Sequence, residues 1–123
     1  MARNSVGWFE IYVDDIERAK KFYETVLDVR LEQIPIDEAQ MWRFPGDPEN
    51  AGSSGALIHM DGFKAGSNST LVYFSCEDTA NEESRVAQAG GRVFKEKFSI
   101  GPYGFISLAF DTEGNMFGLH SLK

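Results

Sequence analysis

The sequence has too few cysteines and basic residues for several common classes of protein. Cys76 is the only cysteine, so no disulfide can form within the chain, as is typical of proteins in a reducing compartment. Acidic residues outnumber lysine and arginine by 19 to 12, which gives a net charge of −7. Because nucleic acids and anionic membranes attract basic surfaces, neither is an expected partner.

Long apolar runs are also missing. No stretch approaches the ~20 apolar residues of a membrane-spanning helix, and no charged-then-apolar leader opens the chain. We therefore expect a cytoplasmic protein. At 123 residues, the chain is long enough for one ordinary domain with a core of its own.

The chain contains an internal repeat. Residues 7–31 read as a strand, an acidic helix start, a helix and a second strand, and residues 70–94 repeat that order. Each half then closes with two extended segments. The repeat predicts an α+β fold of two tandem βαβββ modules, about residues 1–63 and 69–123, within one domain. Neither module could bury its sheet face alone, so each must pack on the other or on a second chain.

The faces of the first strand follow from its alternation. Phe9, Ile11 and Val13 share one side, because successive side chains of a strand point in opposite directions. Apolar residues at helical spacing predict a helix over 16–27, whose apolar stripe packs on that side. The other side of the strand, which carries Trp8, Glu10 and Tyr12, is left to face something else.

Both predicted helices begin with the spacing of a capping box, in which an acceptor side chain is followed three residues later by a carboxylate. Asp14 and Glu17 have this spacing in the first module, and Thr79 and Glu82 have it in the second. We expect Asp14 and Thr79 to be the helix N-caps.

Several motifs together resemble a known family. They are VDDIERAKKFYE after the first strand, Gly90-Gly91 after the second helix, and DTEGNMFGLHS at the end. In this order they resemble the vicinal oxygen chelate superfamily, which comprises glyoxalase I, bleomycin-resistance proteins and extradiol dioxygenases. The ending is similar to the family's D-P-x-G-N-x-x-x-L, with Thr112 in place of proline. WFEIYV, SSGALIHM and KEKFSIGPYGF further resemble its glyoxalase-related subgroup of unassigned activity.

The resemblance implies curved mixed sheets that form a ligand cup, and a homodimer. It also places four metal ligands, one on the first and one on the last strand of each module. Transferred to this chain, they fall on Trp8, His59, about Leu71 (or Thr70) and Gly118. One possible ligand in four cannot hold a divalent ion. We therefore expect no metal and no other cofactor.

The same transfer, combined with strand alternation, predicts which side chains line the cup. Its polar members are expected to be few, as in most small-molecule sites: Glu10, His59, Tyr73, Ser75 and His120. Its apolar members are Trp8, Tyr12, Leu57, Leu71 and Met116, and Trp42 and Tyr103 flank loops that could close over it. Trp8 offers a flat surface on which a planar ligand could stack, and Gly118 would leave room beside it.

Two functions fit this lining. In the first, a metal-free enzyme of the glyoxalase-related type uses Glu10 with His59 or His120 to move a proton on a small metabolite. In the second, the protein binds or sequesters a small organic compound without chemistry, as bleomycin-resistance proteins do. Two histidines and a carboxylate also suggest a relocated iron site. The sequence leaves open whether the cup forms within one chain or across a dimer.

Overall fold

The computed structural model describes residues 4–47 and 49–123. Residues 1–3 of the predicted first module and residue 48 lie outside this described part. The first module contains β1 (Trp8–Tyr12), α1 (Ile16–Leu27), β2 (Glu32–Ile34), β3 (Gln40–Arg43) and β4 (Ser54–His59). The second contains β5 (Tyr73–Ser75), α2 (Thr79–Val86), β6 (Arg92–Ser99), the short 3-10 helix η1 (Gly101–Tyr103), β7 (Phe105–Phe110) and β8 (Met116–Ser121).

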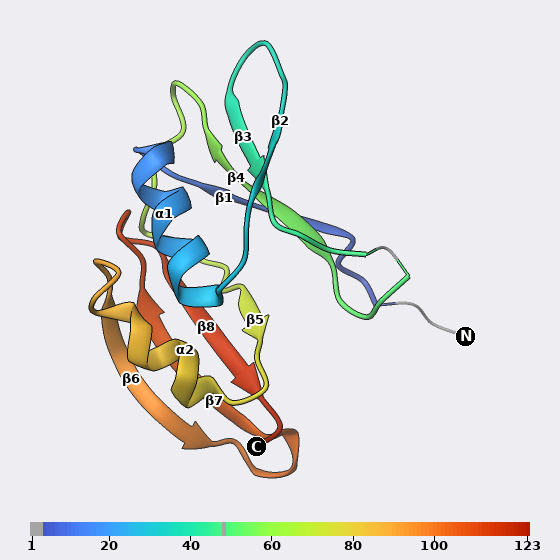
Figure 1. The fold of residues 1–123 in the computed structure, drawn as a ribbon, viewed down its shortest axis with the longest axis vertical. Coiled ribbons are helices and arrows are strands. Elements are labelled where there is room, and N and C mark those ends of the chain that lie inside the picture. The colour runs from blue at the N-terminus through green and yellow to red at the C-terminus, as the bar shows by residue number, and fades with distance from the viewer. Residues whose placement is uncertain (1–3, 48) are drawn as a thin grey trace.

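The strands form two mixed sheets with the same topology, one per module. Sheet 1 has the order β1-β4-β3-β2, and sheet 2 has the order β5-β8-β7-β6. In each sheet the first strand of the module pairs in parallel with the last, and the other pairs are antiparallel. The two helices lie next to each other on one side of the sheets (Figure 1). The predicted α+β fold of two repeated modules is confirmed, although the two sheets do not close into a barrel.

Helix α1 spans the predicted residues, but its cap lies one residue later than expected. The N-cap is Asp15, whose side chain accepts a hydrogen bond from the Arg18 main-chain N–H at 3.1 Å. Asp14 instead accepts a hydrogen bond from the N–H of Ala65, in the segment between the modules, at 3.1 Å. The sequence has two adjacent aspartates here, and only the path of the linker separates their roles.

The N-cap of helix α2 lies one residue earlier than expected. Its N-cap is Asp78, which accepts from the N–H of Ala80 at 3.0 Å. Thr79, the predicted cap, is the first helical residue and is fully buried. Its N–H donates to the Ser121 hydroxyl at 3.1 Å, which ties the start of the helix to β8.

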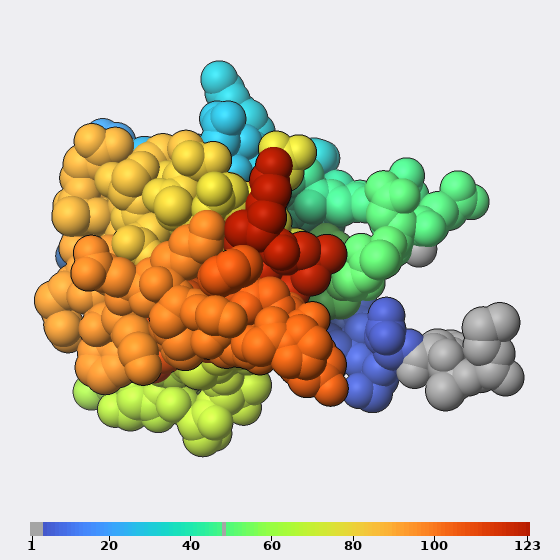
Figure 2. Space-filling model, turned by 90° about the horizontal axis from the view of Figure 1, so that it is seen from below, coloured from blue at the N-terminus to red at the C-terminus, as the bar shows by residue number. Residues whose placement is uncertain are grey.

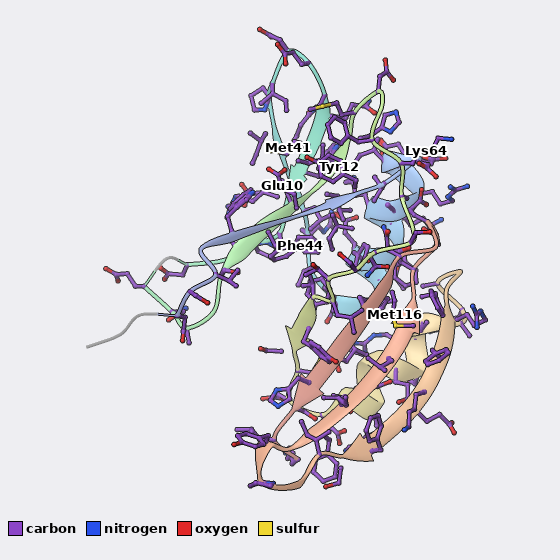
Figure 3. The ribbon with its side chains drawn as sticks, turned by 180° about the vertical axis from the view of Figure 1, so that it is seen from behind. Glu10, Tyr12, Met41, Phe44, Lys64 and Met116 are labelled. Atoms are coloured by element: carbon purple, nitrogen blue, oxygen red, sulfur yellow. The ribbon has the colours of Figure 1, made fainter. Side chains whose placement is uncertain are left out.

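The predicted faces of β1 are confirmed. Ile11 and Val13 belong to the main hydrophobic core and Phe9 packs against it, together with the buried stripe of α1. Trp8, Glu10 and Tyr12 point to the other side, which the helices do not cover. Figure 3 shows this uncovered side, with Glu10, Tyr12 and Met41 on sheet 1 and the strands of sheet 2 below them.

Aromatic rings from both modules form the centre of the core. Tyr23 of α1 packs against Phe44 and Phe74 at centroid distances of 5.6 and 5.8 Å, and against Phe117 of β8 at 5.5 Å. Phe9 of β1 is 6.0 Å from Phe74 of β5. Because these rings come from both halves of the chain, neither module could keep this core without the other.

Two polar contacts fasten α1 to the turn before β8. Arg18 forms an ion pair with Glu113, with Nε 2.6 Å from Oε2, and the Glu113 side chain is fully buried. The Tyr23 hydroxyl donates to Asp111 at 2.6 Å in the interior. Within residues 4–47 and 49–123, no helix is long and apolar enough to cross a membrane.

Candidate ligand clefts between the modules

The largest of the clefts at the junction of the modules has a volume of about 690 Å³. We call it the Trp8 cleft. It brings together four of the predicted site residues, Trp8 from the first module and Leu71, Tyr73 and Ser75 from the second. Residues 51–53 of the long loop after β3 also reach it. In Figure 2 this loop (green) and the start of the chain (blue) lie at the same end of the molecule, beyond the orange second module.

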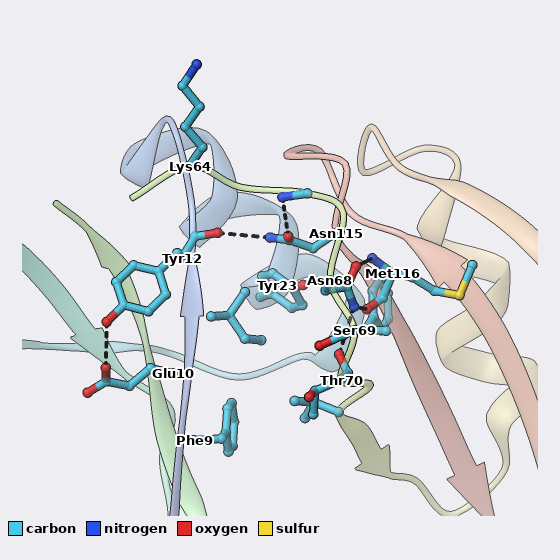
Figure 4. Close-up of a pocket in the computed structure, with 14 residues that line it drawn as sticks. Phe9, Glu10, Tyr12, Tyr23, Lys64, Asn68, Ser69, Thr70, Asn115 and Met116 are labelled. Carbon is cyan, nitrogen blue, oxygen red and sulfur yellow. Dashed lines mark hydrogen bonds between the residues drawn. The ribbon is translucent and has the colours of Figure 1, made fainter. Parts of the chain in front are cut away.

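A second cleft of about 460 Å³ lies farther along β1 (Figure 4). We call it the Tyr23 cleft, after the buried tyrosine at its base. Glu10, Tyr12 and Met116, all predicted site residues, line it. The two clefts share Phe9, Thr70 and Val72, so they are neighbours along the same junction.

Glu10 is held by the two aromatic residues beside it on β1. Trp8 Nε1 donates to one of its carboxylate oxygens at 3.2 Å, and the Tyr12 hydroxyl donates to the other at 3.0 Å. Burial, together with the hydrogen bond to Glu10 and its negative charge, raises the pKa of Tyr12. The Tyr12 ring in turn stacks on Phe63 at 5.0 Å. Glu10 is thus a fixed acceptor with no histidine among its hydrogen-bond partners.

The segment between the modules contributes to the Tyr23 cleft, a role that its sequence does not predict. Asn68, Ser69 and Thr70 line this cleft, although KAGSNS reads only as a polar linker. The Asn68 amide donates to the main-chain oxygens of Thr70 and Met116 at 2.8 and 2.9 Å. Asparagine side chains often hold a turn through such bonds, so the one available signal was an asparagine in a short linker.

The Tyr23 hydroxyl is uncharged in this cleft. Burial raises the pKa of Tyr23 well above its ordinary value, and the nearby Asp111 carboxylate raises it further. Burial also raises the pKa of Asp111, although hydrogen bonds from Tyr23 and the main chain oppose this. Tyr23 therefore keeps its proton, and its hydroxyl donates a hydrogen bond to Asp111, which holds the ring in place.

Two predicted cup residues lie on the wrong face of sheet 1. The parallel register pairs Leu57 with Ile11, so Leu57 points toward α1 and is fully buried in the core. His59 follows on the same side at the end of β4, where its Nδ1 is 2.9 Å from the main-chain oxygen of Val13. The expectation that both face the cup is wrong, because the family resemblance does not fix the register of β4, and this register turns Leu57 and His59 toward the helices.

Two aromatic residues expected to close over the cup do not do so. Trp42 pairs with Leu57 across the sheet and lies on the helix side, with the Lys20 ammonium 4.2 Å from its ring centroid. Tyr103 is 74% exposed in η1. Its main-chain oxygen is 2.7 Å from Nε2 of His120, which fixes that histidine at the far end of sheet 2, away from Glu10.

Comparisons with known proteins agree with this architecture. A family model described as bleomycin resistance protein-like N-terminal matches residues 6–35. Comparison with curated proteins found no match.

Solved structures match 93–100% of this chain. TnmS3, an antibiotic binding protein from Streptomyces sp. CB03234, has a TM-score of 0.73 at 24% identity, over 100% of this chain and 99% of that one. A glyoxalase/bleomycin resistance protein from the same organism has a TM-score of 0.72 at 24% identity, over 95% of this chain and 100% of that one. Glyoxalase I from Zea mays has a TM-score of 0.73 at 21% identity, over 93% of this chain and 43% of that one. The chain has the vicinal oxygen chelate fold.

The four positions that carry the metal in glyoxalase I-like members of this superfamily can now be placed. Trp8 and Leu71 line the Trp8 cleft, whereas His59 lies on the helix side of sheet 1. Gly118 does not leave the room expected of it, because the Tyr73 ring of β5 lies directly over its Cα. These positions therefore form no shared ligand set.

No other metal-binding group replaces them in residues 4–47 and 49–123, where no three His, Cys, Asp or Glu side chains are grouped to hold an ion. Glu10, His59 and His120, considered as a relocated site, do not come together. Burial, with the nearby Glu82 carboxylate, raises the pKa of the Cys76 thiol to about 12, so this cysteine is a poor nucleophile and a poor ligand.

Proposed function

We propose that this chain is a metal-free binding protein for a small organic molecule, which it holds in the Trp8 cleft. The observation that carries the proposal is the meeting of Trp8 with Leu71, Tyr73 and Ser75, residues from both modules, around a cleft of about 690 Å³. Ligand sites are commonly concave and mainly apolar, with a few polar groups. The fold is shared with an antibiotic binding protein, which supports a binding role.

Exposure of Trp8 fits this role. The residue is 42% exposed, while its Nε1 donates a hydrogen bond to Glu10. Part of the indole is therefore available to a ligand, and the hydrogen bond to Glu10 orients it before a ligand arrives. A pre-oriented aromatic group loses little side-chain entropy on binding.

The alternative, proton transfer by Glu10 and a histidine, is not favoured by this arrangement. A catalytic pair must lie within hydrogen-bond reach or be joined by one water. Glu10 is bonded to Trp8 and Tyr12, while His59 and His120 are each fixed to main-chain oxygens elsewhere. We propose binding without turnover.

A thermal-shift screen tests the proposal. The library should hold aromatic, 2-oxo and amide-bearing compounds. Binding is detectable as a rise in melting temperature, because a ligand at ~100 times its dissociation constant adds about 2.7 kcal/mol to the free energy of unfolding. We expect hits whose effect is at least halved by Trp8→Ala and kept by the control Trp42→Ala, since Trp42 lies on the helix side. Hits that are equally sensitive to both variants would contradict the proposal.

We also propose that the protein is a cytoplasmic homodimer. The side of sheet 2 opposite the helices carries Ile106, Leu108 and Phe110, and Phe94 beside them is 57% exposed. Contiguous apolar surface of this kind often marks an interface. A second copy of the chain bound on this surface would also help to enclose the clefts.

A further inference from the structure

The first strand of sheet 1 has one unpaired edge. The N–H of Val13 donates to the main-chain oxygen of Ile58 at 2.8 Å, so this residue points its main-chain groups toward β4. Main-chain groups alternate in direction along a strand, so those of Trp8, Glu10 and Tyr12 point away from β4. The Asn115 side-chain amide, which donates to the Tyr12 oxygen at 3.0 Å from outside the sheet, agrees with this direction.

The first strand of sheet 2 is arranged in the same way. The N–H of Cys76 donates to the oxygen of His120 at 2.7 Å, and the N–H of Gly118 donates to the oxygen of Val72 at 2.8 Å. These bonds direct the even-numbered residues of this segment toward β8. The main-chain groups of Tyr73 and Ser75 therefore point to the free edge of β5.

Both free edges border the Trp8 cleft. This cleft is lined by Trp8 and Phe9 of β1 and by all three residues of β5. Within residues 4–47 and 49–123, the hydrogen bonds found outside the paired strands do not reach the N–H or C=O groups of Trp8, Glu10, Tyr73 or Ser75. Unpaired groups on a strand edge are a template for a further strand.

We propose that the ligand of the Trp8 cleft is a peptide or peptide-like molecule, bound in an extended conformation between β1 and β5. This inference rests on the proposed function, and it adds the chemical class of the ligand. Amide groups of the ligand pair with the free main-chain groups of both strands. β5 has three residues, about 10 Å at 3.3 Å per residue, so it pairs with roughly three ligand residues.

The surroundings of the two edges suit such a ligand. Side chains of an extended chain alternate between two faces. On one face they meet Trp8 and Tyr73, and on the other they meet Phe9 and Phe74, whose rings are 6.0 Å apart. A planar ligand without amides would cover the same main-chain groups and leave them unpaired, which is unfavourable in a desolvated site.

The test starts from a library of random pentapeptides that are acetylated and amidated at their ends. Binders to the wild-type chain are selected, and their affinities are then measured with Ser75→Pro and with the control Ser75→Ala. Proline removes the outward N–H of position 75, which is tolerated at a strand edge, whereas alanine removes only the hydroxyl. We expect Ser75→Pro to bind the selected peptides at least fivefold more weakly than Ser75→Ala does, since both variants lack the hydroxyl and only the proline variant also lacks the outward N–H.

A second measurement does not depend on the fold of the proline variant. Each selected peptide is remade with a single N-methylated amide at each position in turn, and its affinity for the wild-type chain is measured. We expect losses of at least fivefold at the paired positions. Selected peptides that are indifferent both to N-methylation and to Ser75→Pro would overturn the inference.

The two levels of the proposal fail differently. If non-amide compounds bind in a Trp8-dependent way and no pentapeptide binds, the peptide inference is wrong and the binding function stands. If neither the compounds nor the peptides bind, the proposed function itself fails.

Discussion

Single residues in this chain take roles that depend on residues distant in the sequence. Asp14 and Asp15 are adjacent and chemically identical, yet one binds the linker and the other caps α1. Glu113 is the clearest case. It accepts hydrogen bonds from the N–H groups of Asp14 and Asp15 at 3.0 and 2.8 Å while pairing with Arg18. A carboxylate at the start of a helix also interacts favourably with the helix dipole.

Replacing Glu113 by glutamine should lower the free energy of unfolding by about 1.5–3 kcal/mol, the range for hydrogen bonds to a charged group. Chemical denaturation measures it, and Glu17→Gln on the exposed side of α1 serves as the control with little change. A loss no larger than that of the control would contradict the role assigned to Glu113.

The same variant has a pH signature. Burial alone would raise the pKa of Glu113, but the hydrogen bonds from Arg18, Asp15 and Thr112 outweigh it and leave the pKa below its ordinary value of 4.5. A carboxylate with a lowered pKa in the folded state contributes stability above its unfolded pKa and loses it as the pH falls through the folded pKa. The difference between wild type and Glu113→Gln should therefore be constant above about pH 5.5 and shrink below about pH 4.5.

In each module, an aromatic ring of the first strand packs on a glycine of the last strand. The Phe9 ring of β1 lies over Gly55 of β4, and the Tyr73 ring of β5 lies over Gly118 of β8. An added Cβ at either glycine would overlap the ring. The repeat in the sequence thus corresponds to a repeated packing device, although Phe9 points toward the helices and Tyr73 toward the open side.

Substituting Gly118 by alanine should destabilise the protein by about 1–3 kcal/mol, the usual cost of overpacking. Gly7→Ala is the matched control, because no other atom lies within 4 Å of the added methyl group. Thermal and urea denaturation measure both variants. The double variant Gly118→Ala/Tyr73→Ala should show a favourable coupling of the two sites, since the ring that causes the overlap has gone. Additive losses would show that the ring is not the cause.

The whole molecule is asymmetric, because both helices cover one side of the two sheets. The core rings of both modules meet beneath α1, and the other side of sheet 2 is left uncovered. A sheet normally buries an apolar face against another layer. This is the physical reason for expecting a second copy of the chain.

Sedimentation velocity should therefore give the mass of two chains at micromolar concentration. Leu108→Asp, on the uncovered side of sheet 2, should shift the equilibrium toward single chains, because a carboxylate would be desolvated in the interface. Gln88→Asp, exposed beyond the end of α2, is the control and should sediment like the wild type. A wild-type protein that sediments as one chain at every concentration would rule out the dimer.

The amino-acid sequence alone predicts the repeat, the two modules, the bounds of α1 and the faces of β1. These features depend on local periodicity, which side-chain alternation and helical spacing make visible. It also indicated that Trp8, Leu71, Tyr73 and Ser75 belong together.

The rest of the site depends on contacts between segments that are distant in the sequence. Strand register is a pairing between distant segments, and a shift of one residue reverses every side chain, which is why Leu57 and His59 were placed on the wrong face. The choice between neighbouring aspartates as helix caps, and the use of the linker as a cleft wall, likewise depend on where distant chain segments meet. The local sequence pattern carries no information about contacts between such distant segments.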